Sequence, residues 1–370
     1  MAVDVREGEL AGLRRLALSG ARREVFAALG AAARDSVRAV VEPSADDADL
    51  RKWLWSAAGK ERYGRLVEAT RRSCGPQWAE LAALAGGSGV GFEELLVTNL
   101  RGDLGVEDGT GCSDLGYHRS PRSFVAHNED GFPAAVGHLT LVTLALDGQA
   151  PVTALWYPGF LTANAFTATG HGLVWGVNHI PVVRPEPTGA GRHFVARALQ
   201  EAPTLDAALA HLRARPTAGG YTYTIGERAS GRVVVVEAVA GRVAVREAGP
   251  DGALLWHTNH LRHLPDPADS PTLLGDGPAA RTHTARYEES LARGRALAAL
   301  RPPEAPTTDW FMEALTSAAP PLGVHRTAAG TDPLTTLCTL VADLSEGTVT
   351  LRGRDGRSGR LPLPVFSGRG

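Results

Sequence analysis

The residues best suited to chemistry in this chain surround Cys112, which follows Gly109-Thr110-Gly111. A thiol is a nucleophile once it loses its proton. If the Gly111–Cys112 bond broke, Cys112 would carry a thiol and a free α-amine on one residue. An α-amine has a pKa of roughly 7.7–8, so it can act as the thiol's own base near neutral pH. Because glycine permits the strained backbone that thiol attack on a peptide carbonyl needs, the sequence predicts self-cleavage at Gly111–Cys112.

Two further side chains fit the chemistry of such a nucleophile. Asp130 follows Cys112 by eighteen residues, which is long enough for a hairpin to return its carboxylate to the amine. An Asp before Gly131 is also a common turn residue, so a structural role stays open. Asn259, in His257-Thr258-Asn259-His260, has an amide N–H that can stabilise an oxyanion. An Asn at the end of a strand can equally well form a turn.

These motifs resemble those of the acyl-CoA:6-aminopenicillanic acid acyltransferase family, a branch of the N-terminal-nucleophile (Ntn) hydrolases. The resemblance spreads over most of the chain, through 20–30, 93–101, 111–113, 126–130, 157–160, 191–194 and 257–260. It implies an α+β fold, an αββα four-layer sandwich of two stacked antiparallel sheets. It also implies a precursor cut into a mostly helical α chain, 1–111, and a β chain, 112–370. The two chains would stay associated as one structural domain.

The resemblance assigns catalysis to Cys112, Asp130, Asn259 and Arg326. Cys112 would form a thioester, its α-amine would move the proton, Asp130 would orient the amine, and Asn259 would stabilise the oxyanion. Arg326 would pair with Asp130 or with a substrate carboxylate. The sequence fits a solvated surface arginine at this position equally well. Residues expected to bind substrate, mostly strand aromatics that can line an acyl pocket, are Tyr157, Phe160, His179, Tyr221 and Tyr223.

The resemblance implies an amide, peptide or acyl-donor substrate and no cofactor. The family includes acylation of a β-lactam nucleus and hydrolysis of β-alanyl amines, and His127-Asn128-Glu129-Asp130 is closer to the second branch. Water as acceptor would give an amidase, and an amine would give an acyltransferase. Tailoring of a small natural product is a hypothesis that rests on the family alone.

Other classes of protein remain open. A cysteine hydrolase without self-cleavage would use His127 or His260 as the base for Cys112. A non-catalytic binding protein would need none of Cys112, Asp130 and Asn259. His257, His260 and His263 are spaced by threes, but no acidic or cysteine ligands accompany them in sequence, so we expect no metal site.

Composition excludes several classes. Lys plus Arg number 38 and Asp plus Glu 40, so the 370-residue chain has no basic excess of the kind that nucleic-acid binding needs. Its three cysteines form neither a disulfide framework nor a zinc pattern. The first 30 residues show no secretory signal and the chain shows no membrane span, which together with free thiols predicts a cytoplasmic protein.

Periodicity predicts a helical front followed by strands, helices and strands. Helices are expected over 5–42, 46–84 and 92–100, and strands follow from about Ser123 to 177. A helical stretch over 192–214, with Thr204 as an N-cap, precedes strands over 221–258. Helices over 279–300 and 309–317 and strands over 335–344 and 348–353 complete the expectation.

Overall fold

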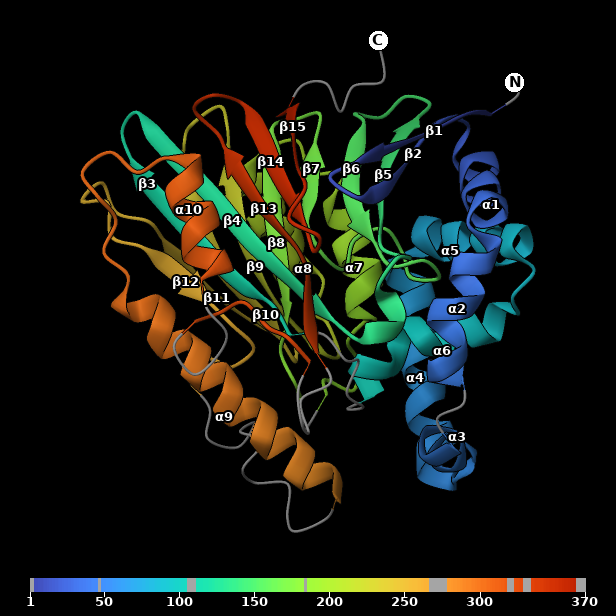
Figure 1. The fold of residues 1–370 in the computed structure, drawn as a ribbon. Helices are drawn as coiled ribbons and strands as arrows, with labels where there is room; N and C mark the ends of the chain where they lie inside the picture. The colour runs from blue at the N-terminus through green and yellow to red at the C-terminus, as the bar shows by residue number, and fades with distance from the viewer. Residues whose placement is uncertain are drawn as a thin grey trace.

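The computed structural model describes residues 3–45, 48–104, 111–182, 185–265, 278–317, 323–328 and 334–363 (Figure 1). Two β-sheets form its centre. The nine-stranded sheet has the order β1-β2-β5-β6-β7-β8-β9-β10-β11, and the six-stranded sheet has the order β12-β3-β4-β13-β14-β15. The strands are β1 (Asp4–Leu10), β2 (Leu13–Gly20), β3 (Ser113–Arg119), β4 (Arg122–Gly131), β5 (Thr140–Leu146), β6 (Val152–Trp156), β7 (Thr167–Thr169), β8 (Leu173–His179), β9 (Gly220–Glu227), β10 (Val233–Val239), β11 (Arg242–Glu247), β12 (Leu255–His257), β13 (Thr335–Asp343), β14 (Thr348–Gly353) and β15 (Ser358–Pro362).

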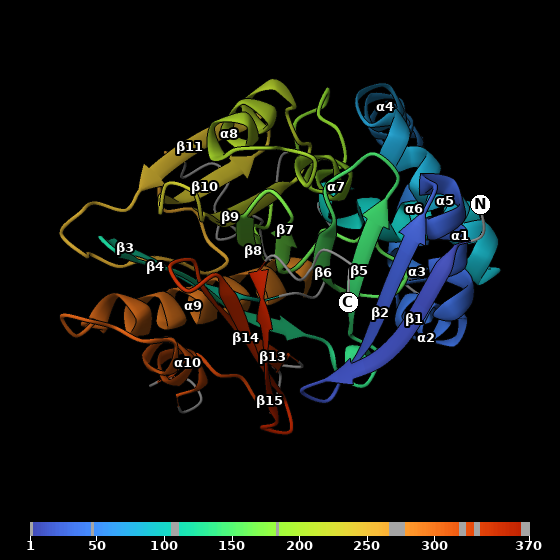
Figure 2. The same cartoon turned by 90° about the horizontal axis from the view of Figure 1, so that it is seen from above.

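Helices lie outside both sheets. They are α1 (Arg22–Ala32), α2 (Arg34–Ala45), α3 (Ala48–Trp55), α4 (Ala57–Ser73), α5 (Gly75–Ser88), α6 (Phe92–Leu100), α7 (Arg192–Leu199), α8 (Leu205–Ala214), α9 (Pro278–Ala299) and α10 (Thr308–Thr316). Seen from above, α7 and α8 lie over the nine-stranded sheet, and α9 and α10 lie outside the six-stranded sheet (Figure 2). Helices α1–α6 gather beside β1, β2 and β5. This arrangement confirms the four-layer αββα prediction.

One pair of strands departs from the predicted antiparallel sheets. Strands β2 and β5 pair in parallel, with Arg14 opposite Thr140 and Gly20 opposite Leu146. A parallel pair needs a long crossover connection, and here all of α1–α6, β3 and β4 intervene between the two strands. A strand that precedes the predicted cleavage site, β2, therefore pairs in the nine-stranded sheet with a strand that follows it, β5.

The helix expected over 5–42 is wrong in its first half, because β1 and β2 form a hairpin there. The loop is Ala11-Gly12, and both residues have positive φ (52° and 82°), which fits a two-residue hairpin turn. Leu16 and Leu18 are buried at a spacing of two, the period of a strand. The same leucines also fit helical steps, so periodicity alone misassigned them.

Other elements agree with the sequence more closely. The helices over 92–100, 279–300 and 309–317 and the strands after Ser123 are confirmed to within a few residues, and Thr204 caps α8 by accepting from the Ala207 N–H. The helical stretch over 192–214 is two helices, α7 and α8. Strands β3 and β15 were not predicted. Among the described residues, no helix is long and apolar enough to span a membrane.

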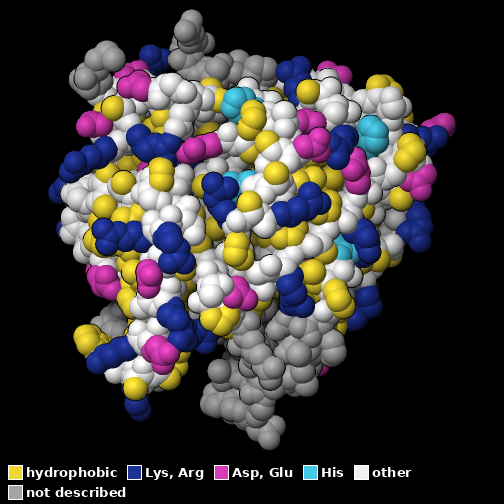
Figure 3. Space-filling view, turned by 180° about the vertical axis from the view of Figure 1, so that it is seen from behind, with side chains coloured by type: hydrophobic (Ala, Val, Ile, Leu, Met, Phe, Trp, Pro, Cys, Tyr) yellow, Lys and Arg dark blue, Asp and Glu magenta, His cyan; other side chains and the backbone are white. Residues whose placement is uncertain are grey.

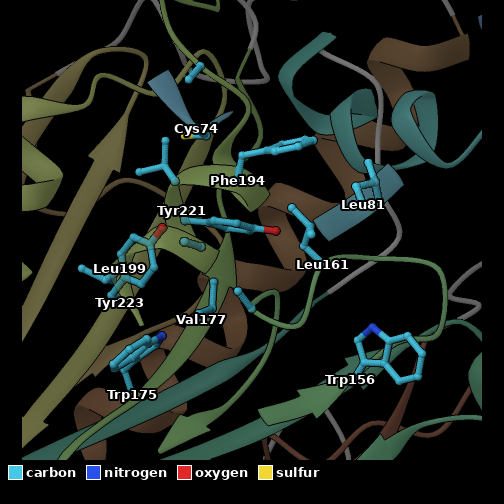
Figure 4. Close-up of a cluster of buried hydrophobic side chains, with 14 of the residues drawn as sticks. Cys74, Leu81, Trp156, Leu161, Trp175, Val177, Phe194, Leu199, Tyr221 and Tyr223 are labelled. Atoms are coloured by element: carbon cyan, nitrogen blue, oxygen red, sulfur yellow. The ribbon is translucent and has the colours of Figure 1, made fainter. Parts of the chain in front are cut away.

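Apolar side chains fill the space on both sides of the nine-stranded sheet. Trp156, Trp175 and Tyr223 belong to the cluster between this sheet and the helices that cover it (Figure 4). A second cluster, which includes Leu155, Phe166 and Leu340, draws on strands of both sheets. The face drawn in Figure 3 carries both basic and acidic side chains.

Candidate active site

Gly111 and Cys112 lie immediately before β3, and the pairing of β3 with β4 continues through them. The Gly111 N–H donates to the Asp130 carbonyl oxygen at 3.1 Å. The next amide, that of Cys112, donates to Asn259 Oδ1 at 3.1 Å. Cys112 is only 1% exposed. The chain thus brings Cys112 together with Asp130 and Asn259, the partners predicted from sequence, although they are 18 and 147 positions away.

The Cys112 thiol lies beside a cluster of buried charged side chains. Its Sγ is 3.7 Å from Glu129 Oε1, and the ligand atoms of Cys112, His127 and Glu129 all lie within 4.8 Å of one another. His127 Nδ1 lies 2.6 Å from Asp114 Oδ1, and Nε2 lies 2.8 Å from Glu129 Oε2. Because carboxylate oxygens accept, both ring nitrogens of His127 donate.

This cluster faces the nine-stranded sheet. A Cβ on Gly176 of β8 would come within 2.6 Å of both Asp114 and His127, so glycine at this position lets the two sheets approach. His127 and Glu129 share a face of β4 because they are two residues apart. The Tyr157 hydroxyl donates to Glu129 Oε1 at 2.7 Å.

Burial and charge set the protonation of this cluster. Burial alone lowers the pKa of His127, but the charge of Asp114 and the bonds to Asp114, Cys112 and Glu129 outweigh it and raise the pKa well above its usual value. Burial, and then the charge of Glu129, raises the pKa of the Cys112 thiol to about 12. The cluster therefore favours a protonated His127, held between the carboxyl groups of Asp114 and Glu129, next to a protonated thiol.

Asn259 is held from three directions. Its Oδ1 accepts from Cys112 N–H and from Arg293 Nη2 (2.7 Å), and its Nδ2 donates to the His179 carbonyl oxygen at 2.9 Å. Since both partners of the first atom are donors, that atom is the amide oxygen. Arg293 of α9 also donates from Nη1 to the Cys112 carbonyl oxygen at 2.6 Å.

Asp130 and Arg326 lie on the other side of β4 from Glu129. The Thr336 hydroxyl donates to Asp130 Oδ1 at 2.7 Å and accepts from the Arg326 backbone N–H at 2.8 Å. Among the described residues, nothing hydrogen-bonds to the buried Asp130 Oδ2. Burial raises the pKa of Asp130 to about 7, and the positive charges of Arg326 and Arg293 limit the rise.

The Arg326 guanidinium packs closely against Gly111. A Cβ there would collide with Arg326 Nη1. Arg326 is almost fully buried and contacts Glu289 of α9 at 3.3 Å, so it is not a solvated surface residue.

The histidines around Asn259 position its loop. His257 Nε2 lies 2.9 Å from Glu237, a buried carboxylate that also accepts from the backbone N–H groups of Arg262, His263 and Leu264. His260 lies 2.9 Å from Ser290 Oγ, which accepts from the Asn259 N–H. Burial lowers the pKa of His260 to about 3 and that of His263 to about 4.

The residues expected to bind substrate do not all lie near Cys112. Tyr157 contacts Glu129 and packs against Phe160. Val177 and its β9 partner Tyr223 face away from the side on which Gly176 meets His127, and Tyr221 and Tyr223 lie in the helix-side core (Figure 4). Strand alternation thus directs these two tyrosines into the core on the face of the sheet away from Cys112, and their role in substrate binding stays a prediction.

His179 meets the site through its backbone. Its carbonyl oxygen holds Asn259, while its ring contacts the guanidinium of Arg192, which lies over the Tyr221 ring. This arrangement gives His179 a structural contact to Asn259.

Sequence reasoning missed Asp114, Glu129, Glu289 and Arg293. The i, i+2 spacing of His127 and Glu129 on a strand, and the i, i+4 spacing of Glu289 and Arg293 on a helix, were available signals. Only the fold shows that these pairs meet at Cys112.

One group among the described residues has the composition and spacing to ligate a metal, namely Cys112, His127 and Glu129. His257, His260 and His263 do not form such a group among those residues. Because both ring nitrogens of His127 already donate to carboxylates, a metal there would have to displace a proton.

Comparison with known proteins places this site in a family. The family described as acyl-coenzyme A:6-aminopenicillanic acid acyl-transferase matches residues 118–357. The chain belongs to this family. The match covers β4, Asp130, Asn259, α9 and Arg326 and begins just after Cys112, and it confirms the resemblance seen in the sequence.

Individual relatives are remote. Over 177 residues the chain is 24% identical to the β-alanyl-dopamine/carcinine hydrolase of Drosophila melanogaster, a match that covers 43% of this chain and 46% of that protein. The chain thus matches about half the length of this curated relative.

Solved structures give fainter likenesses. A conjugated bile acid hydrolase variant from Clostridium perfringens has a TM-score of 0.40 at 10% identity, covering 68% of this chain and 94% of that one. Penicillin V acylase from Agrobacterium tumefaciens has a TM-score of 0.38 at 12% identity, covering 70% and 88%.

Proposed function

We propose that this protein is a self-processing Ntn enzyme that cleaves or forms an amide bond through a Cys112 thioester. The observation that carries the proposal is the setting of the Gly111–Cys112 bond. The thiol, the nitrogen that would become an amine, and the carbonyl of Cys112 each have a defined partner, in Glu129, Asn259 and Arg293 respectively.

In this proposal the cut divides the chain into 1–111 and 112–370, and the two parts stay associated. Support comes from the nine-stranded sheet, in which β2 from the first part pairs with β5 from the second along seven residue pairs. Helix α1 also packs against β5. Separation would expose this sheet edge and its core, so association is strongly favoured.

The released α-amine of Cys112 would act as base for the thiol. Asn259 Oδ1 already accepts from this nitrogen, and Asp130 offers a buried carboxylate oxygen with no described hydrogen-bond partner. Asn259 Nδ2 donates one N–H to His179, and its second N–H can serve the oxyanion. Arg326 supports the Asp130 side of the site, because its backbone N–H donates to the Thr336 hydroxyl that holds Asp130.

The alternative of a His-base cysteine hydrolase is disfavoured by the hydrogen bonds of the histidines. A general base needs a free lone pair, and both ring nitrogens of His127 donate to carboxylates. His260, whose pKa burial lowers to about 3, is too weak a base near neutral pH.

For the substrate we propose a small amide, with β-alanyl amides first and an acyl-transfer or natural-product tailoring reaction second. Support comes from the family and from the relative named as a β-alanyl-dopamine/carcinine hydrolase.

The test is intact mass of the purified protein. Wild type should give two fragments, the second beginning Cys-Ser-Asp-Leu, while Cys112→Ala should stay whole and inactive. Hydrolysis of a panel of β-alanyl amides by the cleaved protein, against matched acetyl amides, tests the substrate class. An uncleaved wild-type chain with full turnover would refute self-processing.

A further inference from the structure

Cleavage of the uncleaved chain needs a base other than the one that the mature enzyme uses. Before the cut, the nitrogen of Cys112 belongs to a peptide bond, and its lone pair is delocalised into the Gly111 carbonyl. Its N–H is donated to Asn259 Oδ1. This nitrogen therefore cannot take the thiol proton. The thiol still needs a base, because burial raises its pKa to about 12.

The side chains around Sγ narrow the choice of base. His127 donates from both ring nitrogens and Tyr157 donates from its hydroxyl, so neither accepts a proton in this arrangement. Glu129 Oε1, 3.7 Å from Sγ, is a carboxyl oxygen that accepts a hydrogen bond from the thiol. Asp130 lies on the opposite face of β4, where it meets Thr336.

We propose that the Glu129 carboxylate is the base that accepts the Cys112 thiol proton during cleavage of the Gly111–Cys112 bond. This inference rests on the self-processing proposed above. His127, Asp114 and Tyr157 act as positioning residues, because they fix both oxygens of the buried Glu129 side chain.

The step balances without a further reactant except water. The Sγ proton moves to Glu129 as Sγ bonds to the Gly111 carbonyl carbon. The C–N bond then breaks, and the proton passes from Glu129 to the departing nitrogen of Cys112. An amine and a thioester result. Water hydrolyses the thioester, which regenerates the thiol and leaves a carboxyl group on Gly111.

The chain then contains two bases for one thiol. Glu129 serves the single intramolecular cut, and the α-amine that this cut creates serves later turnovers. This division of roles explains why Glu129 lies beside a thiol whose pKa it raises. The carboxylate disfavours a thiolate that exists before the reaction, and it accepts the proton while the thiol attacks.

The experiment follows cleavage in a cell-free translation reaction stopped at timed intervals, with the fraction of full-length chain read by gel and mass. Glu129→Gln can keep its oxygen toward Tyr157 and turn its amide toward a neutral His127, so the packing is conserved. General bases contribute typically ~10²–10⁴-fold, so we expect cleavage at least ~10²-fold slower than in wild type. Glu129→Asp, which keeps the charge, should fall between the two.

The matched control is Glu80→Gln. Glu80 is an equally buried carboxylate on α5, paired with Arg22 and Arg197 away from Cys112, and we expect this variant to cleave at the wild-type rate. The unfolding midpoint of each purified variant shows that it is folded. If Glu129→Gln fails to fold, the comparison of Glu129→Asp with wild type carries the test.

Hydroxylamine identifies the step, because it cleaves a thioester and leaves an amide intact under mild conditions. Full-length Glu129→Gln chains should resist it, since they never reach the thioester. Hydroxylamine-labile chains, or cleavage of Glu129→Gln at the wild-type rate, would overturn the role of Glu129 while leaving self-processing intact. A wild-type chain that stays whole would instead refute self-processing itself.

Discussion

Arg293 donates a hydrogen bond from Nη2 to Asn259 Oδ1 at 2.7 Å, and this contact determines which way the amide of Asn259 faces. A guanidinium only donates, so the amide oxygen must point toward Arg293 and the Cys112 nitrogen. The same Arg293 reaches the Cys112 carbonyl oxygen and Ser113 Oγ. One side chain of α9 thus links the nucleophile to its amide partner.

Asn259→Ala should lower kcat by ~10²–10³ in the cleaved enzyme, because an oxyanion donor acts mainly in the transition state. KM should change little. Steady-state kinetics on the best β-alanyl amide measures both. A raised KM with an unchanged kcat would show that Asn259 binds substrate or has a structural role.

Arg293→Met should act through Asn259. It removes the donors while keeping an unbranched apolar stem, so the Asn259 amide is free to turn. In a double-mutant cycle the loss in kcat for Arg293→Met with Asn259→Ala should be much less than the sum of the two single losses. Additive losses would show that Arg293 acts independently.

Asp130→Asn should keep the fold and lose most activity, since a neutral amide cannot hold an ammonium with a full charge. The measurement is single-turnover acylation of Cys112 by an activated thioester, after confirming that the variant is cleaved. Acylation at the wild-type rate would remove Asp130 from the mechanism.

Asp130 should also make the uncleaved chain less stable at higher pH. Its pKa is about 7 in the fold against an ordinary 3.8, so between these values the folded chain holds a proton that the unfolded chain lacks. The free energy of unfolding then falls as pH rises through this window, by at most about 4 kcal/mol. Urea unfolding should show that the free energy of unfolding falls less between pH 5 and pH 8 in Cys112→Ala/Asp130→Asn than in Cys112→Ala. Comparing the two chains cancels the contribution of His127, and equal falls would contradict the assignment.

Glu237→Gln should loosen the Asn259 loop. The carboxylate of Glu237 accepts from His257 and three backbone N–H groups, and although burial raises its pKa, these bonds lower it overall to about 2. Breaking a buried pair of this kind costs about 3–5 kcal/mol. Because the carboxylate is the form that the fold stabilises, the stability difference from wild type should persist above pH 5 and shrink as pH falls from about 4.5 toward 2. A difference that is constant over this range would argue against an ionised Glu237.

Activity should survive exhaustive chelation and vanish with iodoacetamide, with the label mapped to the peptide that begins at Cys112. A thiol with its own amine needs no Lewis acid. Elemental analysis should find no stoichiometric zinc. Loss of turnover on chelation, restored by added metal, would redirect attention to the cluster of Cys112, His127 and Glu129.

The sequence by itself predicted a chemistry for this protein and identified its family, and the family is confirmed. Residue types are local, so a Cys after Gly-Thr-Gly, an Asp eighteen residues on and an Asn between histidines could be read directly. The alternation of apolar and polar residues also located most strands after Ser123. The N-terminal hairpin escaped because Leu16 and Leu18 fit two periods at once.

Only the tertiary structure decided which side chain faces the thiol. On β4, Glu129 and Asp130 are neighbours in sequence but point to opposite faces, and the antiparallel register of β3 on β4, with Ser113 opposite Asn128, places Cys112 opposite Glu129. Glu289 and Arg293 reach the site from α9, although they lie 177 and 181 residues after Cys112 in sequence. Pairing between distant segments depends on how whole layers pack, and no local spacing encodes it.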